Sequence, residues 1–114
     1  MAGTSYPDDI IGIVSTAAIA QFQPVQATGA PAVAAGNAIG FAQTAASAAG
    51  VRVPVAVGMT SIAIAGAAIA LGAAVEVHTT VTQVVTKSAG VTIGRALNAA
   101  AAAGDQVEIL IIPN

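Results

Sequence analysis

Branched aliphatic side chains recur at every second position in short runs along this chain. Val53, Val55 and Val57 alternate with other residues, and the same spacing returns at Ile62 and Ile64. A period of two places alternate side chains on opposite faces of an extended strand, whereas an amphipathic helix has a period near 3.6. Gly, Ala, Ser and Pro separate the runs, as they do in all-β sandwiches and barrels. The pattern therefore predicts a β protein.

Eight or nine segments fit this pattern, with residues 61–65 as an additional short one, and we expect about eight strands. The segments are residues 10–14, 22–27, 39–43, 51–57, 61–65, 74–78, 81–87, 91–97 and 107–112. We expect the first two to pair with each other. Pro24 has no backbone N–H to donate, which predicts a sheet edge for its strand. The predicted fold is all-β, a small antiparallel β-barrel or sandwich.

The domain organisation follows from the length of the chain and from its first residues. A chain of 114 residues provides one core. Residues 1–9 lack periodicity, and Pro7 favours an extended backbone at Tyr6. We therefore expect an extended N-terminal arm over residues 1–9 and a single β domain over residues 10–114. The arm is either a frayed terminus or a segment that packs onto a neighbouring subunit through Tyr6 and Pro7.

The surface of such a domain would carry very little charge. Charged residues make up 7% of the chain, against about 25% in an average soluble domain. A fold of this mass exposes roughly 5,600 Å², and so few charges leave apolar patches on that area. We expect partners to cover much of the surface.

Several function classes lack the residues that they require. Three basic residues and a net charge of −2 cannot form the positive stripe that binds nucleic acid. The chain has no Cys, which excludes thiolate catalysis and agrees with assembly in a reducing cytoplasm. His78 is the only histidine, no Ser lies in a Gly-x-Ser-x-Gly elbow, and the pairs Asp8/Asp9 and Asp105/Glu108 lie beside a terminus or a turn. We expect no enzyme activity, no metal and no cofactor.

Two alternatives remain open from the residues alone. Residues 53–75 form an uncharged stretch long enough to cross a bilayer, although Pro54 and three glycines interrupt it. A small membrane-inserted protein is therefore one alternative. The other is a soluble β module that recognises a glycan or an extended surface through a group of threonines, namely Thr79, Thr80, Thr82 and Thr86.

The C-terminal third contains three consecutive motifs, Thr92-Ile93-Gly94-Arg95-Ala96-Leu97, the Ala-rich residues 98–103, and Gly104-Asp105-Gln106-Val107-Glu108-Ile109-Leu110-Ile111. In this order they resemble the C-terminal part of the capsid cement, or head decoration, proteins of tailed phages. Further upstream, Gln23-Pro24-Val25, Val55-Ala56-Val57-Gly58, residues 72–77 and residues 84–86 occur in the order of that family's strands and turns. The likeness extends over residues 11–112, and this chain carries less charge than its relatives.

The resemblance implies a structural role on a virion. Proteins of this family bind the outer surface of an icosahedral head, where capsid subunits meet, commonly as trimers, and stabilise the shell against the pressure of packaged DNA. The implied partners are the major capsid protein and further copies of the chain, as a trimer rather than a dimer, with no nucleic acid and no membrane. Assembly would occur in the host cytoplasm. As inter-subunit or capsid contacts we expect Tyr6 and Pro7 in the arm, and Phe22 and Phe41 as apolar anchors in the core or an interface.

Overall fold

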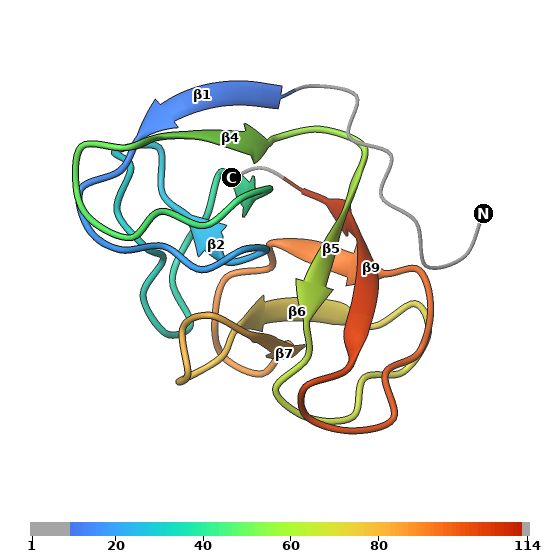
Figure 1. The fold of residues 1–114 in the computed structure, drawn as a ribbon. Coiled ribbons are helices and arrows are strands. Elements are labelled where there is room, and N and C mark those ends of the chain that lie inside the picture. Colours follow the sequence, from blue (N-terminus) through green and yellow to red (C-terminus); the bar gives the residue numbers. More distant parts are fainter. Residues whose placement is uncertain (1–9, 113–114) are drawn as a thin grey trace.

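The computed structural model describes residues 10–112, and all regular structure in this range is β-strand (Figure 1). The strands are β1 (Ile10–Val14), β2 (Pro24–Val25), β3 (Gly40–Ala42), β4 (Arg52–Ala56), β5 (Thr60–Ile64), β6 (Ala74–Val77), β7 (Val84–Thr86), β8 (Gly94–Ala96) and β9 (Gln106–Ile111). Each overlaps a segment that the alternation predicted, so the all-β prediction is confirmed. The predicted arm over residues 1–9 lies outside the described residues.

The strands form two antiparallel sheets, in the orders β1-β4-β3-β2 and β5-β9-β8-β6-β7. The predicted pairing of the first two strands is wrong, because β1 pairs with β4 and β2 pairs with β3. Ile11 and Ile13 lie opposite Val55 and Val53 in the β1–β4 pair. That register pairs five residues and opposes branched side chains at two of them, whereas β2 offers only two residues to pair. The predicted edge position of the Pro24 strand is confirmed.

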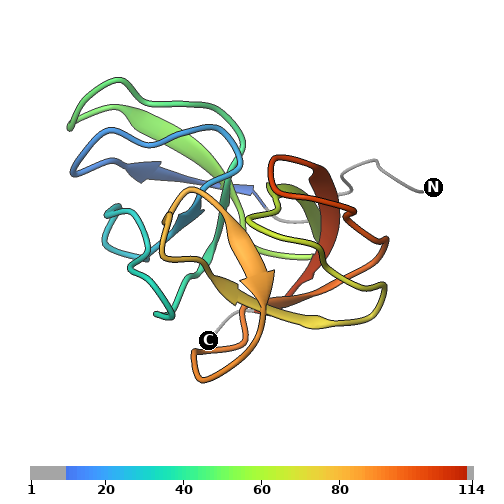
Figure 2. The same ribbon diagram turned by 90° about the horizontal axis from the view of Figure 1, so that it is seen from below.

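The two sheets belong to two copies of one structural unit, which we call lobe 1 (residues 10–57) and lobe 2 (residues 58–112). A shift of 50 residues relates β1 and β2 to β5 and β6, and a shift of 54 relates β3 and β4 to β8 and β9. The same shifts relate the paired residues of the two sheets. Ile10↔Ala56 corresponds to Thr60↔Leu110, Ile11↔Val55 to Ser61↔Ile109, Pro24↔Phe41 to Ala74↔Arg95, and Ile19↔Ala46 to Ile69↔Ala100. The extra strand β7 lies between the two matched parts of lobe 2. Figure 2 shows the lobes side by side, with lobe 1 in blue to green and lobe 2 in yellow-green to red.

Matching turns in the two lobes need the same unusual backbone conformation. Gly50 and Gly104 correspond to each other and have φ values of 88° and 90°. Phe22 and Gly72 also correspond, with φ values of 65° and 85°. A glycine adopts positive φ without strain, whereas a side chain with a Cβ does not. Lobe 1 therefore carries local strain at Phe22 that lobe 2 avoids.

Each lobe contains a cluster of buried side chains at corresponding positions. Ile19, Val25, Ala42, Ala46, Val53 and Val55 form the cluster of lobe 1, and Ile69, Val75, Ala96, Ala100, Val107 and Ile109 belong to that of lobe 2. The lobe 2 cluster also includes side chains from lobe 1, among them Phe41 and Ala56. One lobe therefore inserts part of its surface into the core of the other.

Candidate interaction surfaces

The four residues predicted as contacts have different positions. Tyr6 and Pro7 lie outside the described residues. Phe22 is half-buried in the turn before β2. Phe41 on β3 has no exposed surface and belongs to the shared core cluster. A contact role for these residues stays a prediction, although Phe41 lies in the interior of this chain.

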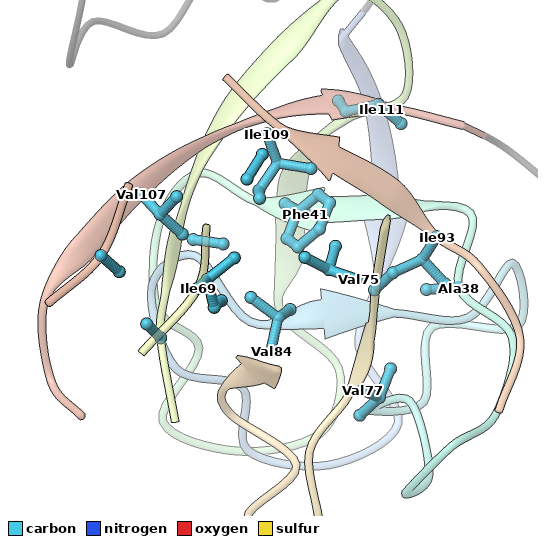
Figure 3. Close-up of a cluster of buried hydrophobic side chains, with 14 of the residues drawn as sticks. Ala38, Phe41, Ile69, Val75, Val77, Val84, Ile93, Val107, Ile109 and Ile111 are labelled. Carbon is cyan, nitrogen blue, oxygen red and sulfur yellow. The ribbon is translucent and has the colours of Figure 1, made fainter. Parts of the chain in front are cut away.

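Phe41 joins the two lobes. It lies on the face of the lobe 1 sheet opposite to its neighbour Ala42, which packs in the lobe 1 cluster. Its ring therefore points away from lobe 1 and lies near Ile109 and Val75 of lobe 2 (Figure 3). The largest side chain of the core thus crosses the boundary between the lobes.

Hydrogen bonds surround this apolar contact. The Gln43 Nε2 donates to the Ser61 Oγ at 2.9 Å, from the end of β3 to β5. Ala35 donates its backbone N–H to the Val77 carbonyl at 2.9 Å and accepts from the Val91 N–H at 3.1 Å. The turn around Ala35 is thereby held between β6 and the segment that leads to β8. The contact between the lobes is therefore specific in register as well as apolar.

Strand β1 presents an apolar surface at the edge of its sheet. Ile10 and Val14, on one face of the strand, are 51% and 47% exposed, and Ile11, on the other face, is 41% exposed; we call these three residues the β1 surface. The corresponding strand β5 is buried over most of its length. Edge strands with exposed apolar side chains pair readily with other chains unless charge or a cover protects them. The β1 surface is therefore a candidate contact.

Lobe 2 has an apolar surface of its own on β8 and β9. Leu97 and Leu110 are 42% and 39% exposed, and Arg95, which pairs with Leu110 across the strands, lies beside them; we call these three residues the β8–β9 surface. The guanidinium of Arg95 donates to the Gly72 carbonyl at 3.1 Å. The charged group thus bends along the surface and leaves the two leucines uncovered.

A pocket of about 260 Å³ opens in lobe 1. It is lined by Gln26, Ala27, Thr28, Val33, Asn37, Ala38 and Ile39. Amides, a hydroxyl and aliphatic groups line it, without a side chain that could act as a general acid or base. The pocket fits an inserted segment of chain better than a reacting substrate.

The residues considered for catalysis are engaged in local backbone contacts. His78 follows β6, and its Nδ1 accepts the Thr80 N–H at 3.0 Å. Asp105 accepts the N–H groups of Ala101 and Ala102, as expected beside a turn. Glu108, by contrast, is buried within β9 rather than solvated. Among residues 10–112, no three His, Asp or Glu side chains gather in a group that could hold a metal ion.

The segments that suggested a membrane span and a glycan-binding module consist of strands and the connections between them. Residues 53–75 contain most of β4, all of β5 and the turn before β6. No helix in residues 10–112 is long and apolar enough to span a bilayer. Of the four threonines, Thr79, Thr80 and Thr86 are exposed and Thr82 is half-buried, in and around the connection from β6 to β7.

Glu76 is a buried carboxylate that no motif in the sequence singles out. It is 9% exposed, and its Oε1 accepts the N–H groups of Ser88 at 2.6 Å and Gly90 at 3.0 Å. These bonds, with the nearby Lys87, hold the pKa of the Glu76 carboxyl below its ordinary value of 4.5, against the opposing effect of burial. Glu76 thereby fixes the turn that reaches Ala35 at the boundary between the lobes.

The lowered pKa of Glu76 predicts a specific dependence of stability on pH. Because the folded-state pKa lies below the unfolded one, the stabilisation is complete above the unfolded pKa and is lost as the pH falls through the folded pKa. We expect Glu76→Gln to lower the free energy of unfolding by about 1 kcal/mol at pH 7. The difference from the wild type should shrink as the pH falls below 4.5. Urea unfolding of both proteins at several pH values measures it, and a difference that stays constant with pH would contradict the assignment.

Comparison with known proteins gives two similarities that span both lobes. A family model described as phage cement protein matches residues 5–111. Among solved structures, the head fiber gp8.5 N base in bacteriophage phi29 is similar, with a TM-score of 0.73 and 14% sequence identity over 91% of this chain and 93% of that chain. At that identity the likeness shows a shared fold. No curated protein matches the sequence.

Proposed function

Because the chain belongs to the phage cement protein family and is therefore a structural protein of the phage capsid, we propose that it binds the outer surface of the icosahedral head and stabilises the shell. The proposed partners are the major capsid protein and further copies of the chain, as a trimer rather than a dimer. Assembly onto the head takes place in the host cytoplasm. The role is adhesive and contains no catalytic step.

The uncovered apolar surfaces support this proposal. Large aliphatic side chains of the β1 surface and the β8–β9 surface are more than a third exposed, in a chain with only 7% charged residues. Contacts with partners remove such side chains from water, and each Å² of apolar area buried contributes roughly 25 cal/mol. On a shell, many identical weak contacts act together, because binding at one contact raises the effective concentration at the next.

Co-sedimentation with phage heads tests the proposal. The purified protein is mixed with heads of its phage that lack their decoration protein, and the heads are pelleted. We expect the protein to pellet with these heads and to remain in the supernatant without them. Bound heads should also release their DNA at a higher temperature than bare heads.

Heads that already carry their full complement of decoration protein provide the matched control. Their sites are occupied, so they should pellet little or none of the added protein. A protein that stays in the supernatant with bare heads would overturn the proposed function. Equal pelleting with bare and decorated heads would also contradict it, since it would indicate non-specific adhesion.

A further inference from the structure

The contact between the lobes uses one face of each. Lobe 1 contributes an inserting face, formed by Ala35, Phe41, Gln43 and Ala56, and lobe 2 contributes a receiving face, formed by Ser61, Val77, Val91 and Ile109. Because the lobes are copies of one unit, lobe 2 also has a counterpart of the inserting face, and lobe 1 has a counterpart of the receiving face. Within one chain, these two counterparts do not meet each other.

The counterpart of the inserting face is the β8–β9 surface. The shift of 54 residues that relates β3 and β4 to β8 and β9 carries Gln43 to Leu97 and Ala56 to Leu110. Ala56 is fully buried, whereas Leu110 is 39% exposed and Leu97 is 42% exposed. The larger apolar side chains thus stand on the uncovered face. A leucine in place of a glutamine or an alanine suits a contact that excludes water.

The counterpart of the receiving face includes part of the β1 surface and the lobe 1 pocket. Ser61, which is fully buried, corresponds to Ile11, which is 41% exposed. The positions of lobe 2 that bind Ala35 are Val77 and Val91. They correspond to Ala27 and Asn37, and both of these line the pocket. The pocket of lobe 1 therefore occupies the position that corresponds to the site on lobe 2 where the turn around Ala35 binds.

We propose that the β8–β9 surface of one copy of the chain docks on Ile11 and the lobe 1 pocket of a second copy, in the arrangement that the two lobes adopt within one chain. Leu97 then contacts Ile11, as Gln43 contacts Ser61 within the chain. Ala89, the counterpart of Ala35 in the exposed turn between β7 and β8, faces the pocket. This proposal rests on the self-association in the proposed function and names the surfaces that carry it.

The contact joins different surfaces on the two copies, so the first copy still has Ile11 and its pocket free, and the second still has its β8–β9 surface free. Such a head-to-tail arrangement adds copies until the rotation between them closes a ring. A symmetric dimer would instead bring the same surface together twice. A ring of three copies satisfies the trimer of the proposed function without any surface left open.

The contact between copies is shallower than the contact within the chain. The counterpart of Phe41 is Arg95. Its guanidinium donates a hydrogen bond to the Gly72 carbonyl at the surface instead of inserting into a core. Lobe 1 already has a filled cluster of its own behind Val25 and Val55. The copies therefore meet through Leu97, Leu110 and Ile11 at the surface, and we expect them to dissociate before either lobe unfolds.

Engineered disulfides test the contact, since the chain has no Cys of its own. The double variant Leu97→Cys/Ile11→Cys should form, on mild oxidation, covalent oligomers larger than a dimer, visible on a non-reducing gel. Either single variant alone should remain monomeric on that gel, because position 97 meets position 11 and not itself. An equal mixture of the two single variants should give a covalent dimer and nothing larger.

The matched control replaces an exposed leucine outside both surfaces. Leu71 is 68% exposed, and Leu71→Cys/Ile11→Cys should give no covalent oligomer. Oxidation is carried out with free protein and with protein bound to heads. A covalent dimer of Leu97→Cys alone, or a double variant that stays monomeric in both settings, would overturn the proposal.

Head binding of the wild type separates this proposal from the proposed function. If the wild type binds heads but the double variant forms no disulfide, the capsid role is retained and this contact is refuted. Protein that forms the disulfide but ignores heads would retain the contact and refute the capsid role.

Discussion

Replacing Phe41 with alanine is expected to lower the free energy of unfolding by about 4 kcal/mol, the largest loss for any single truncation in this chain. Phe41 is the largest side chain of the core and has no exposed surface. Its ring is packed among lobe 2 side chains, so the cavity would open between the lobes (Figure 3). Rigid strands from both lobes line that cavity and cannot collapse to fill it. Urea unfolding followed by circular dichroism measures the change.

A matched truncation at the surface separates the cavity from the loss of a large side chain as such. Leu71 is 68% exposed, and Leu71→Ala should change the free energy of unfolding by no more than about 0.5 kcal/mol. Both variants are compared at the same protein concentration, because self-association stabilises the folded state by mass action. A loss below about 1.5 kcal/mol for Phe41→Ala would mean that the lobes close over the missing ring, and that its packing does not hold them together.

The alternation of apolar residues predicts the strands of this protein well, because each strand has one face on a core. Val53 and Val55 face the lobe 1 cluster, and Val107 and Ile109 face the lobe 2 cluster. That periodicity locates strands but carries no information about their partners. The pattern therefore gives no reason to prefer β4 over β2 as the partner of β1, and the predicted pairing of β1 with β2 is wrong.

The internal repeat also has a sequence signal, which the strand pattern conceals. Ala-Ala-Ile-Ala occurs at residues 17–20 and again at 67–70, and Ile-Gly-x-Ala occurs at 39–42 and at 93–96. In a chain so rich in Ala, Ile and Gly, short matches of this kind arise readily by chance. They become evidence only when the paired strands place both motifs at corresponding positions of two lobes.

The candidate surfaces are the part that the sequence predicts least. The sequence predicts Phe41 as a core or interface anchor, but its place between two lobes of one chain depends on the repeat. Ile11 and Leu97 look like ordinary strand residues, because their exposure is set by which lobe covers which sheet. The longest motifs of the resemblance lie in the C-terminal third, which belongs to lobe 2, and the motifs in lobe 1 are shorter, so the resemblance indicates little of what lobe 1 contributes.

Replacing Gly40 with alanine is expected to lower the free energy of unfolding by about 3 kcal/mol, at the upper end of the usual effect of overpacking. A Cβ at this position would occupy the space of the Ala56 carbonyl oxygen and would lie 2.9 Å from the carbonyl carbon. These are backbone atoms of the neighbouring strand β4, so the strands would have to separate. A Cβ on the corresponding Gly94 would likewise meet the backbone of its neighbouring strand β9, 2.6 Å from the Leu110 carbonyl oxygen. Gly94→Ala should therefore destabilise by a similar amount, since the repeat imposes one requirement on both lobes.

Gly12→Ala is the matched control, because it makes the same substitution in a strand of the same sheet. There the nearest atom is the Arg52 Nη1 at 2.9 Å, at the end of a flexible and exposed side chain that can move aside. An alanine in place of a strand glycine removes backbone freedom from the unfolded chain, so this variant should be as stable as the wild type or slightly more so, by up to about 1 kcal/mol. If Gly40→Ala and Gly94→Ala unfold at the same urea concentration as Gly12→Ala, close approach of the backbones is not what keeps these positions glycine, and the lobes can accommodate wider strand spacing without a loss of core contact.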